Sequence, residues 1–307
     1  MGGKYLRAPN IYHIIRKKGS LVPISHYTTA RLGVTTGANE FFFIRQLTPG
    51  KYITTLGGDE MEISFPDTFV KPVIRTVSEC KNISFRASAT SWRIVTLPEK
   101  VTHRKALEYI KLGEQRGIPK RPFFHGKKLW YSLSFLPTDV IAVPEIISAR
   151  YFFLWNQDSC ILNKNFYGFV PKQQDIFLIW GLLNCSYSFL QFELSGRKPG
   201  AGASGISVDI ANRILVPFVN SVGTTEQQAI KFAGKSLLYA PIREIWDDSV
   251  SEERRCLDDV IFDILGLTKG ERDAVYEAMI NLVEARLKKA ESLSPKTKSK
   301  IAEVEID

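Results

Sequence analysis

Three residues fit a loose pattern for metal-dependent cleavage of nucleic acid. Pro66-Asp67 is followed, after eleven residues, by Glu79-Cys80-Lys81. In such a site Asp67 and Glu79 would hold Mg²⁺, and Lys81 would help to position the attacking water. The pattern is short and its spacing is permissive, so chance matches are frequent. A Mg²⁺-dependent nuclease is therefore kept as an alternative interpretation.

Two glycine-containing motifs resemble nucleotide-binding loops but lack the context that such loops need. The stretch from Gly200 to Gly205 matches the dinucleotide fingerprint, yet it follows a predicted helix rather than a strand. Gly234-Lys235-Ser236 resembles the end of a P-loop, but Ala229 stands where that loop requires a glycine. We therefore expect a flexible loop at 196–205 and no phosphate-binding loop at 234–236.

The cysteines and histidines are too scattered to suggest a metal site or a disulfide framework. No two of the four cysteines are closely spaced, and the four histidines form no cluster. This cysteine usage suits the cytoplasm, and we expect no metal site. The residues concerned are Cys80, Cys160, Cys185, Cys256, His13, His26, His103 and His125.

The positive charge is unevenly distributed along the chain. Residues 1–243 hold 31 basic and 16 acidic residues, whereas residues 244–307 hold 10 basic and 16 acidic residues. A basic body with an acidic tail suggests a polyanionic partner for the first part only. Two other interpretations stay open. The lysines could simply keep the surface soluble, or the acidic tail could dock another protein in a non-catalytic scaffold.

One basic stretch combines cations with aromatic residues. Between Lys100 and Lys128 there are nine Lys or Arg residues and two Glu residues, and the stretch runs on into Trp130 and Tyr131. Cations meet phosphates, and aromatic or guanidinium planes meet bases, so the combination suits a nucleic-acid surface. The alternative is that Trp130 and Tyr131 are core residues of a strand.

The segment Arg31–Phe42 resembles a known family signature. It is similar to the pattern R-x-G-x-x-T-G-x-N-x-x-F in the C-terminal specificity region of TaqI-like and Eco57I-like adenine-specific (N6) DNA methyltransferases and restriction-modification enzymes. Six further segments resemble the same region in the same order along the chain. They are Lys4–Pro9, Phe69–Arg75, Pro144–Phe153, Asn163–Gly168, Leu182–Ser186 and Leu257–Thr268.

The resemblance implies a target-recognition domain that reads duplex DNA while a separate methyltransferase domain flips out the adenine. Hydroxyl and amide groups at 35–39 could bond base edges or phosphates, and Gly37 would permit a tight turn. The alternative is a purely structural turn in which Asn39 caps its own backbone. The candidate DNA-contacting residues are Arg31, Thr35, Thr36, Asn39, Lys71, Arg75, Arg121, Lys127, Lys128, Trp130, Arg150, Asn163, Arg197 and Lys198.

The catalytic signature of that family is missing. N6-adenine methyltransferases need an Asn/Asp/Ser-Pro-Pro-aromatic loop around the flipped base, and this sequence contains no Pro-Pro dipeptide. It also lacks a convincing glycine-rich strand end for S-adenosylmethionine. We therefore expect no methylation by this chain alone and no cofactor. S-adenosylmethionine would bind a partner catalytic domain or subunit, and the chain would be a separate specificity polypeptide or a fragment of a longer enzyme.

The elements that must position these residues are predicted from periodicity and turn residues. Short β-prone runs fill 24–96, including Phe41–Ile44, Tyr52–Thr55 and Trp92–Val95. Helices are expected at 9–19, 102–116 with Thr102 as N-cap, and 173–194. The last of these includes the apolar run Ile176–Phe192, which is 17 residues long and polar in places, so we expect a buried helix and no membrane span. Further strands are expected around 129–133, 139–143, 150–155 and 166–170.

The C-terminal part reads as a helical hairpin. Apolar stripes around Leu257 and Val275 flank a turn, and Thr268 and Glu271 form a capping-box pattern at the start of the second helix. Residues 294–300 read as a solvated end. The predicted class is α+β: a mixed, mostly antiparallel β target-recognition domain with inserted helices at 1–223, and a C-terminal helical segment at 224–307.

Overall fold

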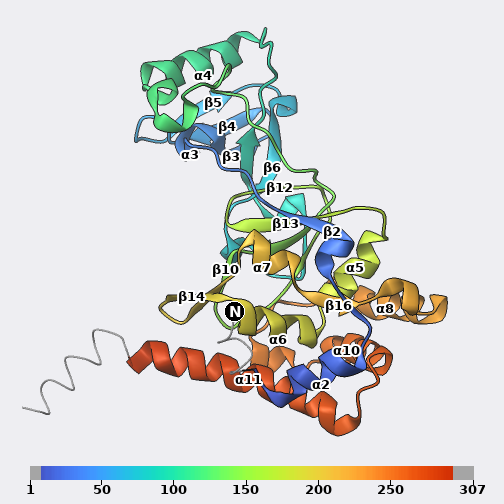
Figure 1. Ribbon diagram of the computed structural model, residues 1–307. Helices are drawn as coiled ribbons and strands as arrows, with labels where there is room; N and C mark the ends of the chain where they lie inside the picture. The colour runs from blue at the N-terminus through green and yellow to red at the C-terminus, as the bar shows by residue number, and fades with distance from the viewer. Residues whose placement is uncertain (1–7, 293–307) are drawn as a thin grey trace, which may run out of the picture.

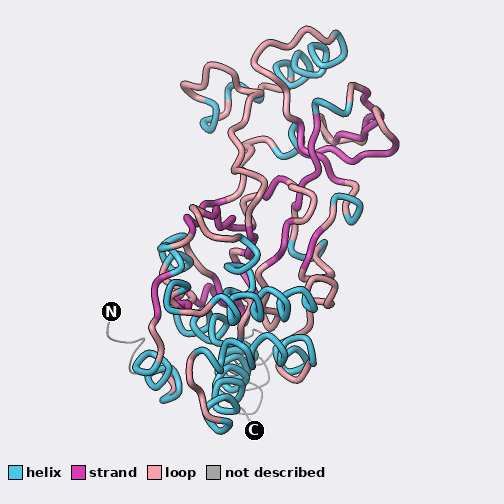
Figure 2. The backbone as a smooth tube through the Cα atoms, turned by 90° about the vertical axis from the view of Figure 1, so that its right-hand side faces the viewer, coloured by secondary structure: helices cyan, strands magenta, loops and turns pink. Residues whose placement is uncertain are grey.

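Figure 1 shows the computed structural model of the protein, which describes residues 8–292. The molecule is elongated and has two hydrophobic cores. The smaller core lies in the upper lobe, which we define as residues 34–73 and 91–135. The larger core lies in the lower body, which comprises the other described residues. Figure 2 shows that most of the helical segments gather in the lower body.

A six-stranded sheet forms the centre of the upper lobe. Its pairs are antiparallel except β12 with β6, where a strand from the lower body joins the sheet edge in parallel. Two helices, α3 (Asn39–Phe42) and α4 (Arg104–Gln115), pack together through Phe41 and Tyr109, whose ring centroids are 4.6 Å apart. In spatial order the strands are β12 (Ile161–Leu162), β6 (Val70–Ile74), β8 (Trp92–Val95), β3 (Phe43–Thr48), β4 (Lys51–Thr54) and β5 (Met61–Ser64).

Most upper-lobe predictions hold, with three corrections. The expected strand at Phe41–Ile44 begins only at Phe43, because Phe41 and Phe42 form the helical turn α3 and are both buried. Helix α4 lies within the predicted range, but its N-cap is His103 rather than Thr102. The strand expected at 129–133 is absent. This segment crosses α4 as irregular chain, and a Cβ atom on Gly113 of α4 would lie 2.4 Å from the Trp130 ring.

The lower body contains a five-stranded sheet and two small sheets. Pairing is antiparallel except between β11 and β7. The large sheet comprises, in spatial order, β2 (Thr28–Leu32), β13 (Phe166–Pro171), β9 (Ile141–Pro144), β11 (Leu154–Asn156) and β7 (Ser84–Phe85). The small sheets comprise β1 (Leu21–Pro23) with β16 (Leu215–Pro217), and β10 (Ile146–Ile147) with β15 (Ala203–Gly205) and β14 (Arg197–Gly200).

Helices surround the lower sheets. The predicted first helix is confirmed, beginning after Pro9 and ending before Gly19. The α-helices of the lower body are α2 (Asn10–Lys18), α5 (Ile176–Leu183), α6 (Ser186–Ser195), α7 (Val208–Asn212), α8 (Thr224–Leu237), α9 (Ile245–Asp248), α10 (Glu252–Ile264) and α11 (Lys269–Ser292). The 3₁₀ turns are Ile24–His26, Asp67–Phe69, Val77–Glu79, Ala87–Ala89, Ile118–Lys120, Pro122–Phe124 and Val219–Ser221.

The long helix predicted at 173–194 is two helices that meet at Asn184. The side chain of Asn184 accepts a hydrogen bond from the Phe153 amide at 3.0 Å and donates one to the Phe153 carbonyl at 2.9 Å. The Trp180 indole donates to the same carbonyl at 2.7 Å, so both backbone polar groups of Phe153 are satisfied by side chains of this region. Helix α5 ends before Asn184, and α6 begins after Cys185. Within residues 8–292 no helix is long and apolar enough to cross a membrane.

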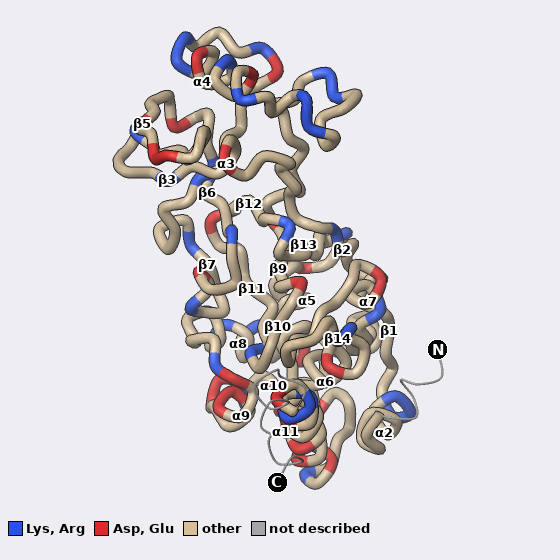
Figure 3. The backbone as a smooth tube through the Cα atoms, turned by 90° about the vertical axis from the view of Figure 1, so that its left-hand side faces the viewer, with Lys and Arg blue, Asp and Glu red and all other residues tan. Residues whose placement is uncertain are grey.

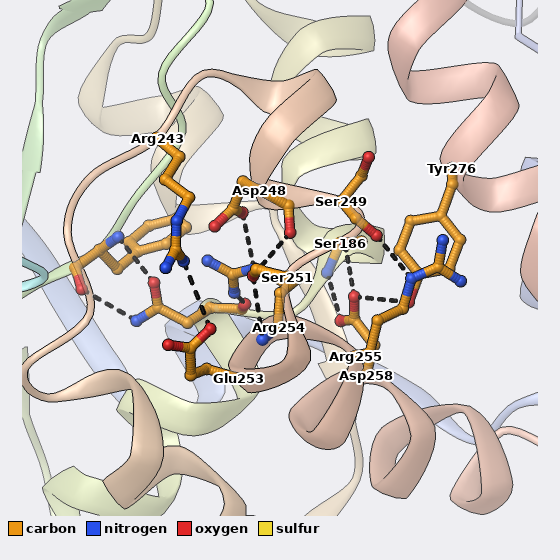
Figure 4. Close-up of polar contacts among 12 residues, drawn as sticks. Ser186, Arg243, Asp248, Ser249, Ser251, Glu253, Arg254, Arg255, Asp258 and Tyr276 are labelled. Atoms are coloured by element: carbon orange, nitrogen blue, oxygen red, sulfur yellow. Dashed lines mark hydrogen bonds and ion pairs between the residues drawn. The ribbon is translucent and has the colours of Figure 1, made fainter.

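The C-terminal helical hairpin is confirmed and is anchored by buried polar contacts (Figure 4). Arg254 of α10 pairs with Asp248 at 2.7 Å and also donates to the Asn184 carbonyl. Asp258, also of α10, accepts from the Ser186 amide at 2.7 Å and from the Tyr276 hydroxyl at 2.9 Å. These bonds join α10 to α6 and to α11.

The capping box predicted at the start of α11 is present, and α11 also contacts the Gly-rich segment at 196–205. The amide of Thr268 donates to the Glu271 carboxylate at 2.7 Å, as predicted, and the Glu271 amide donates to the Thr268 hydroxyl at 3.4 Å. The flexible loop expected at 196–205 is instead the hairpin β14–β15, and Arg286 of α11 donates to the Gly202 carbonyl at its turn.

The fold class is α+β with mostly antiparallel sheets, as predicted. The solvated end at 294–300 lies outside the described residues.

Candidate nucleic-acid interface

The loop at 35–39 connects β2 to α3 and presents two of its three candidate side chains. Thr35 and Asn39 are exposed, whereas Thr36 is buried. The Thr36 hydroxyl donates to the Asn39 side-chain oxygen at 2.5 Å and accepts from the Ala38 amide at 3.3 Å. Thr36 therefore holds the shape of the turn from inside, and Thr35 and Asn39 remain available to a ligand.

Arg121 ties this loop to the basic stretch. Its guanidinium pairs with Glu40 and donates to the Gly37 carbonyl at 3.3 Å. Burial raises the pKa of Glu40, but the hydrogen bond and charge of Arg121 oppose this and leave the pKa below its usual value. Gly37 has φ of 68° and packs against the Phe123 ring, so a side chain there would be both strained and crowded.

Lys127 and Lys128 lie beside the same loop and are exposed. The Lys127 ammonium lies 3.8 Å from the centre of the Phe123 ring, and partial burial lowers the pKa of Lys127. Both lysines and Thr35 line a hollow of about 430 Å³, which we call the basic hollow. Two segments that are about ninety residues apart in the sequence thus meet at one surface. The remaining lining residues are Glu99, Leu129, Ser132, Leu133 and Ser134.

Trp130 belongs to the core rather than to the surface. It is 8% exposed and packs on Phe41, with ring centroids 4.7 Å apart. Tyr131, which is partly exposed, donates its hydroxyl to the Glu99 carbonyl at 3.0 Å. The core alternative considered for the two aromatics therefore holds for Trp130, although no strand forms there. In this conformation the Trp130 ring cannot stack on a base.

Lys71, Arg75 and Asn163 lie where the upper lobe meets the lower body. Lys71 is exposed on β6, while Arg75 follows the end of that strand and stacks on Trp92, with the guanidinium carbon 3.7 Å from the ring centre. Burial lowers the pKa of Arg75, and the charge of Glu79 opposes this. Asn163 is buried and donates to the Arg75 carbonyl at 3.0 Å, so it acts as a structural link.

The other four candidates lie on the lower body and are all exposed. Arg31 stands on β2 opposite Gly168 of β13, and Arg150 follows β10. Arg197 and Lys198 lie on β14, where the Lys198 ammonium pairs with Glu193 at 2.6 Å. The structure therefore gathers Thr35, Asn39, Arg121, Lys127 and Lys128, and leaves these four elsewhere. Figure 3 likewise shows Lys and Arg positions on α4 and the neighbouring loops at the end of the upper lobe.

A second hollow, of about 350 Å³, lies between the β3–β4 turn and the start of β8. The sequence analysis did not predict this hollow, for which the sequence offers only a weak signal, the hydroxyl residues Ser88, Thr90 and Ser91 shortly before Arg93. Arg93 is the charged residue in its lining, and its guanidinium donates to the carbonyls of Thr90 at 2.9 Å and Trp92 at 3.0 Å. The polar lining residues are Gln46, Thr48, Ser88, Thr90, Ser91 and Arg93.

The residues of the nuclease pattern are not brought together. Asp67 precedes β6 and accepts from the Tyr52 hydroxyl and the Gly50 amide. Glu79 lies beyond the other end of β6, where it accepts from Thr76 at 3.1 Å. A strand of this length separates its ends by roughly 13 Å, too far for two carboxylates to share one metal ion. Within the described part of the chain, no group of three or more His, Cys, Asp or Glu residues could hold a metal ion.

The fold of the chain is similar to parts of two solved restriction-modification enzymes. The type IIG restriction endonuclease BpuSI has a similar fold, with a TM-score of 0.61 and 10% identity over 94% of this chain and 34% of that chain. The type IIL restriction-modification enzyme MmeI, solved in complex with DNA, gives a TM-score of 0.52 and 16% identity over 85% of this chain and 36% of that chain.

The chain therefore spans about a third of the length of these two solved chains. No curated protein matches it. The family described as "Type II methyltransferase M.Eco57I, C-terminal domain" matches residues 7–250, which is well over half of the sequence. This match confirms the resemblance found in the sequence. The chain belongs to the family of M.Eco57I-type C-terminal domains of type II methyltransferases.

Proposed function

We propose that this chain recognises a specific sequence in duplex DNA on behalf of an N6-adenine methyltransferase, with the upper lobe as the reading surface. The observation that carries the proposal is the meeting of the 35–39 loop with Lys127 and Lys128 around one hollow. The lysines supply charge to phosphates, which gives affinity without sequence preference. The exposed hydroxyl of Thr35 and amide of Asn39 supply the directional hydrogen bonds that base edges require.

The second hollow suits a phosphate of the same duplex. Its polar lining consists of hydroxyls, an amide and Arg93; the Gln46 amide already donates to the Asp67 carboxylate at 3.4 Å, so the hydroxyls and Arg93 are the donors for an anion. Such a set donates to an anion without repelling it. Contacts of this kind fix the register of a protein on DNA but carry no sequence information. We therefore assign positioning to the hollow beside Arg93 and reading to the basic hollow.

The transfer of a methyl group would be performed by a catalytic methyltransferase domain or subunit that binds S-adenosylmethionine. Two observations support this division. The sequence lacks the Pro-Pro loop that surrounds a flipped adenine, and the family to which it belongs is described as a C-terminal domain of a methyltransferase. We assign this chain the role of holding and reading the duplex, with double-stranded DNA and that catalytic part as its partners.

A scaffold that docks proteins through its acidic tail is less well supported. The tail helices α10 and α11 bury Leu257, Val275 and Val283 completely in the core of the lower body. Deleting residues 244–307 would therefore open that core rather than remove an independent docking surface. The acidic residues of these helices, other than the buried Asp258, are exposed or partly exposed and are explained as the solvated face of packed helices.

Selection from a library of random duplexes tests the proposed function. The full chain is incubated with the library at a fixed salt concentration, and bound duplexes are recovered and sequenced over several rounds. We expect the enrichment of one sequence, because specific binding of such proteins exceeds their non-specific binding by several orders of magnitude. Equal recovery of all sequences would show that the chain binds charge only, and would overturn the proposal.

A further inference from the structure

The basic hollow contains one acidic residue, Glu99, whose presence a phosphate-binding role does not explain. Glu99 is exposed and lines the hollow with Lys127 and Lys128. Among residues 8–292 its carboxylate takes part in no ion pair within 4.0 Å. A carboxylate at 4 Å from a phosphate is repelled by about 1 kcal/mol even in water, and by more near a protein surface. Its position therefore suits a hydrogen-bond donor rather than an anion.

The backbone at Glu99 is held by a hydrogen bond, while its side chain is exposed. The Tyr131 hydroxyl donates to the Glu99 carbonyl at 3.0 Å, and the Tyr131 ring lies edge-on to Trp130 with centroids 5.9 Å apart. Trp130 is in turn packed in the upper core on Phe41. The peptide that carries the carboxylate is thus attached to the core through two aromatic residues. Such support keeps an acceptor in place for a directional contact.

The hydrogen-bonding groups on the base edges indicate which base the Glu99 carboxylate would contact. An ionised carboxylate only accepts hydrogen bonds. In the major groove guanine presents two acceptors, thymine presents an acceptor and a methyl group, and adenine presents an acceptor beside its amino group. Cytosine presents its amino group as its only hydrogen-bonding atom there. An acceptor-only side chain therefore favours cytosine.

We propose that Glu99 is a specificity-determining residue that reads a cytosine amino group, so that the basic hollow selects a C·G pair at one position of the target. This inference rests on the proposed function. Thr35, Ser132 and Ser134 line the same hollow with hydroxyls, and the phosphate contacts of Lys127 and Lys128 would hold the duplex over it.

The test compares Glu99→Gln with Glu62→Gln, in the full chain. Glu62 lies on β5 of the same lobe with an exposed side chain, so both substitutions remove one negative charge. Both variants and the unaltered chain are taken through the random-duplex selection. Their affinities are then measured for the enriched site and for duplexes with each base pair changed singly. Thermal melting confirms folding, and the Tyr131 contact survives because it uses the backbone carbonyl of Glu99.

We expect Glu99→Gln to change the preferred base at one position from cytosine to adenine, because an amide matches the donor and acceptor of adenine. The ratio of affinities for the two bases should shift by at least roughly fivefold. Glu62→Gln also removes one negative charge, and it should raise the affinity for every duplex by the same factor, with no change in the preferred base. If Glu99→Gln keeps the original preference at every position, the inference is overturned and the proposed function stands. If the unaltered chain enriches no sequence, both are overturned.

Discussion

Arg254 and Asp248 form an ion pair at 2.7 Å, with 0% and 4% of their side chains exposed. The guanidinium also bonds the carbonyl of Asn184, at the break between α5 and α6. The pair therefore connects the C-terminal helices to the core of the lower body, close to the second buried cluster around Asp258 (Figure 4). Breaking one half of such a pair leaves the other charge buried without compensation.

The first prediction follows from that pair. Arg254→Met should lower the free energy of unfolding by about 3–5 kcal/mol, because the Asp248 carboxylate loses its partner in the interior. Arg213→Ala is the control, since its pair with Asp209 is exposed, and it should cost no more than about 1 kcal/mol. Urea denaturation measures both. Adding Asp248→Leu to Arg254→Met should recover part of the loss, and a double variant less stable than the single one would contradict this explanation.

The second prediction concerns acid stability. The hydrogen bond from Lys18 and the Thr268 amide lower the pKa of Glu271 from 4.5 to about 2. Because the folded pKa is the lower one, the ionised carboxylate stabilises the fold above pH 4.5, and this stabilisation is lost as the pH falls from 4.5 to about 2. Glu271→Gln should therefore melt at a lower temperature than the unaltered chain at pH 7. The two melting temperatures should converge toward pH 2, and a pH-independent difference would contradict the assignment.

The third prediction concerns the charge of the basic hollow. Lys127→Ala and Lys128→Ala should weaken binding to all duplexes by the same factor, because phosphate contacts carry no sequence information. Each substitution should reduce the slope of log affinity against log salt by about 0.9. Fluorescence anisotropy at several salt concentrations measures this slope. Lys235→Ala, which removes an exposed lysine on α8, should leave the slope unchanged. If the slope changed equally in all three variants, the basic hollow would not be part of the DNA interface.

The fourth prediction concerns Gly37 in the 35–39 loop. Gly37 and Gly117 both have positive φ, but only Gly37 has a neighbour in the path of a Cβ atom, the Phe123 ring. Gly117→Ala should cost about 1–3 kcal/mol from backbone strain. Gly37→Ala should cost more and should also weaken DNA binding, since it moves the loop away from Arg121. Denaturation and binding assays on both variants test this, and equal effects would show that the Phe123 contact does not matter.

Local signals predicted much of this molecule. Pro9 and Gly19 bound the first helix, and the reciprocal bonds of Thr268 and Glu271 form as a capping box should. The features that the sequence did not predict depend on contacts between residues that are far apart in the chain. Asn184, at the break between α5 and α6, bonds to the backbone of Phe153, which is about thirty residues away in the sequence. Trp130 is buried against α4 at Gly113, where a Cβ atom would collide with its ring. Apolar periodicity alone reports neither.

The candidate site was predicted only in part, for the same reason. Thr35, Lys127 and Lys128 were singled out by residue type, but their meeting depends on the Arg121 contacts with Glu40 and Gly37. Glu99 and the hollow beside Arg93 have no linear motif strong enough to find them. The division of the chain at 223/224 stays a prediction, as do the DNA contacts of the exposed candidates.

The contact between α2 and α11 constrains the order in which the protein can form. Lys18 donates to the carboxylate of Glu271 at 2.7 Å and to the carbonyl of Gly266 at 3.2 Å, across about 250 residues. During synthesis the first helix therefore emerges long before its partner, while the upper lobe has all its strands except β12 within the first third of the chain. Contacts of such sequence separation slow folding. The lower body must complete its core only after the last helices have left the ribosome, by which time the upper lobe can already be folded.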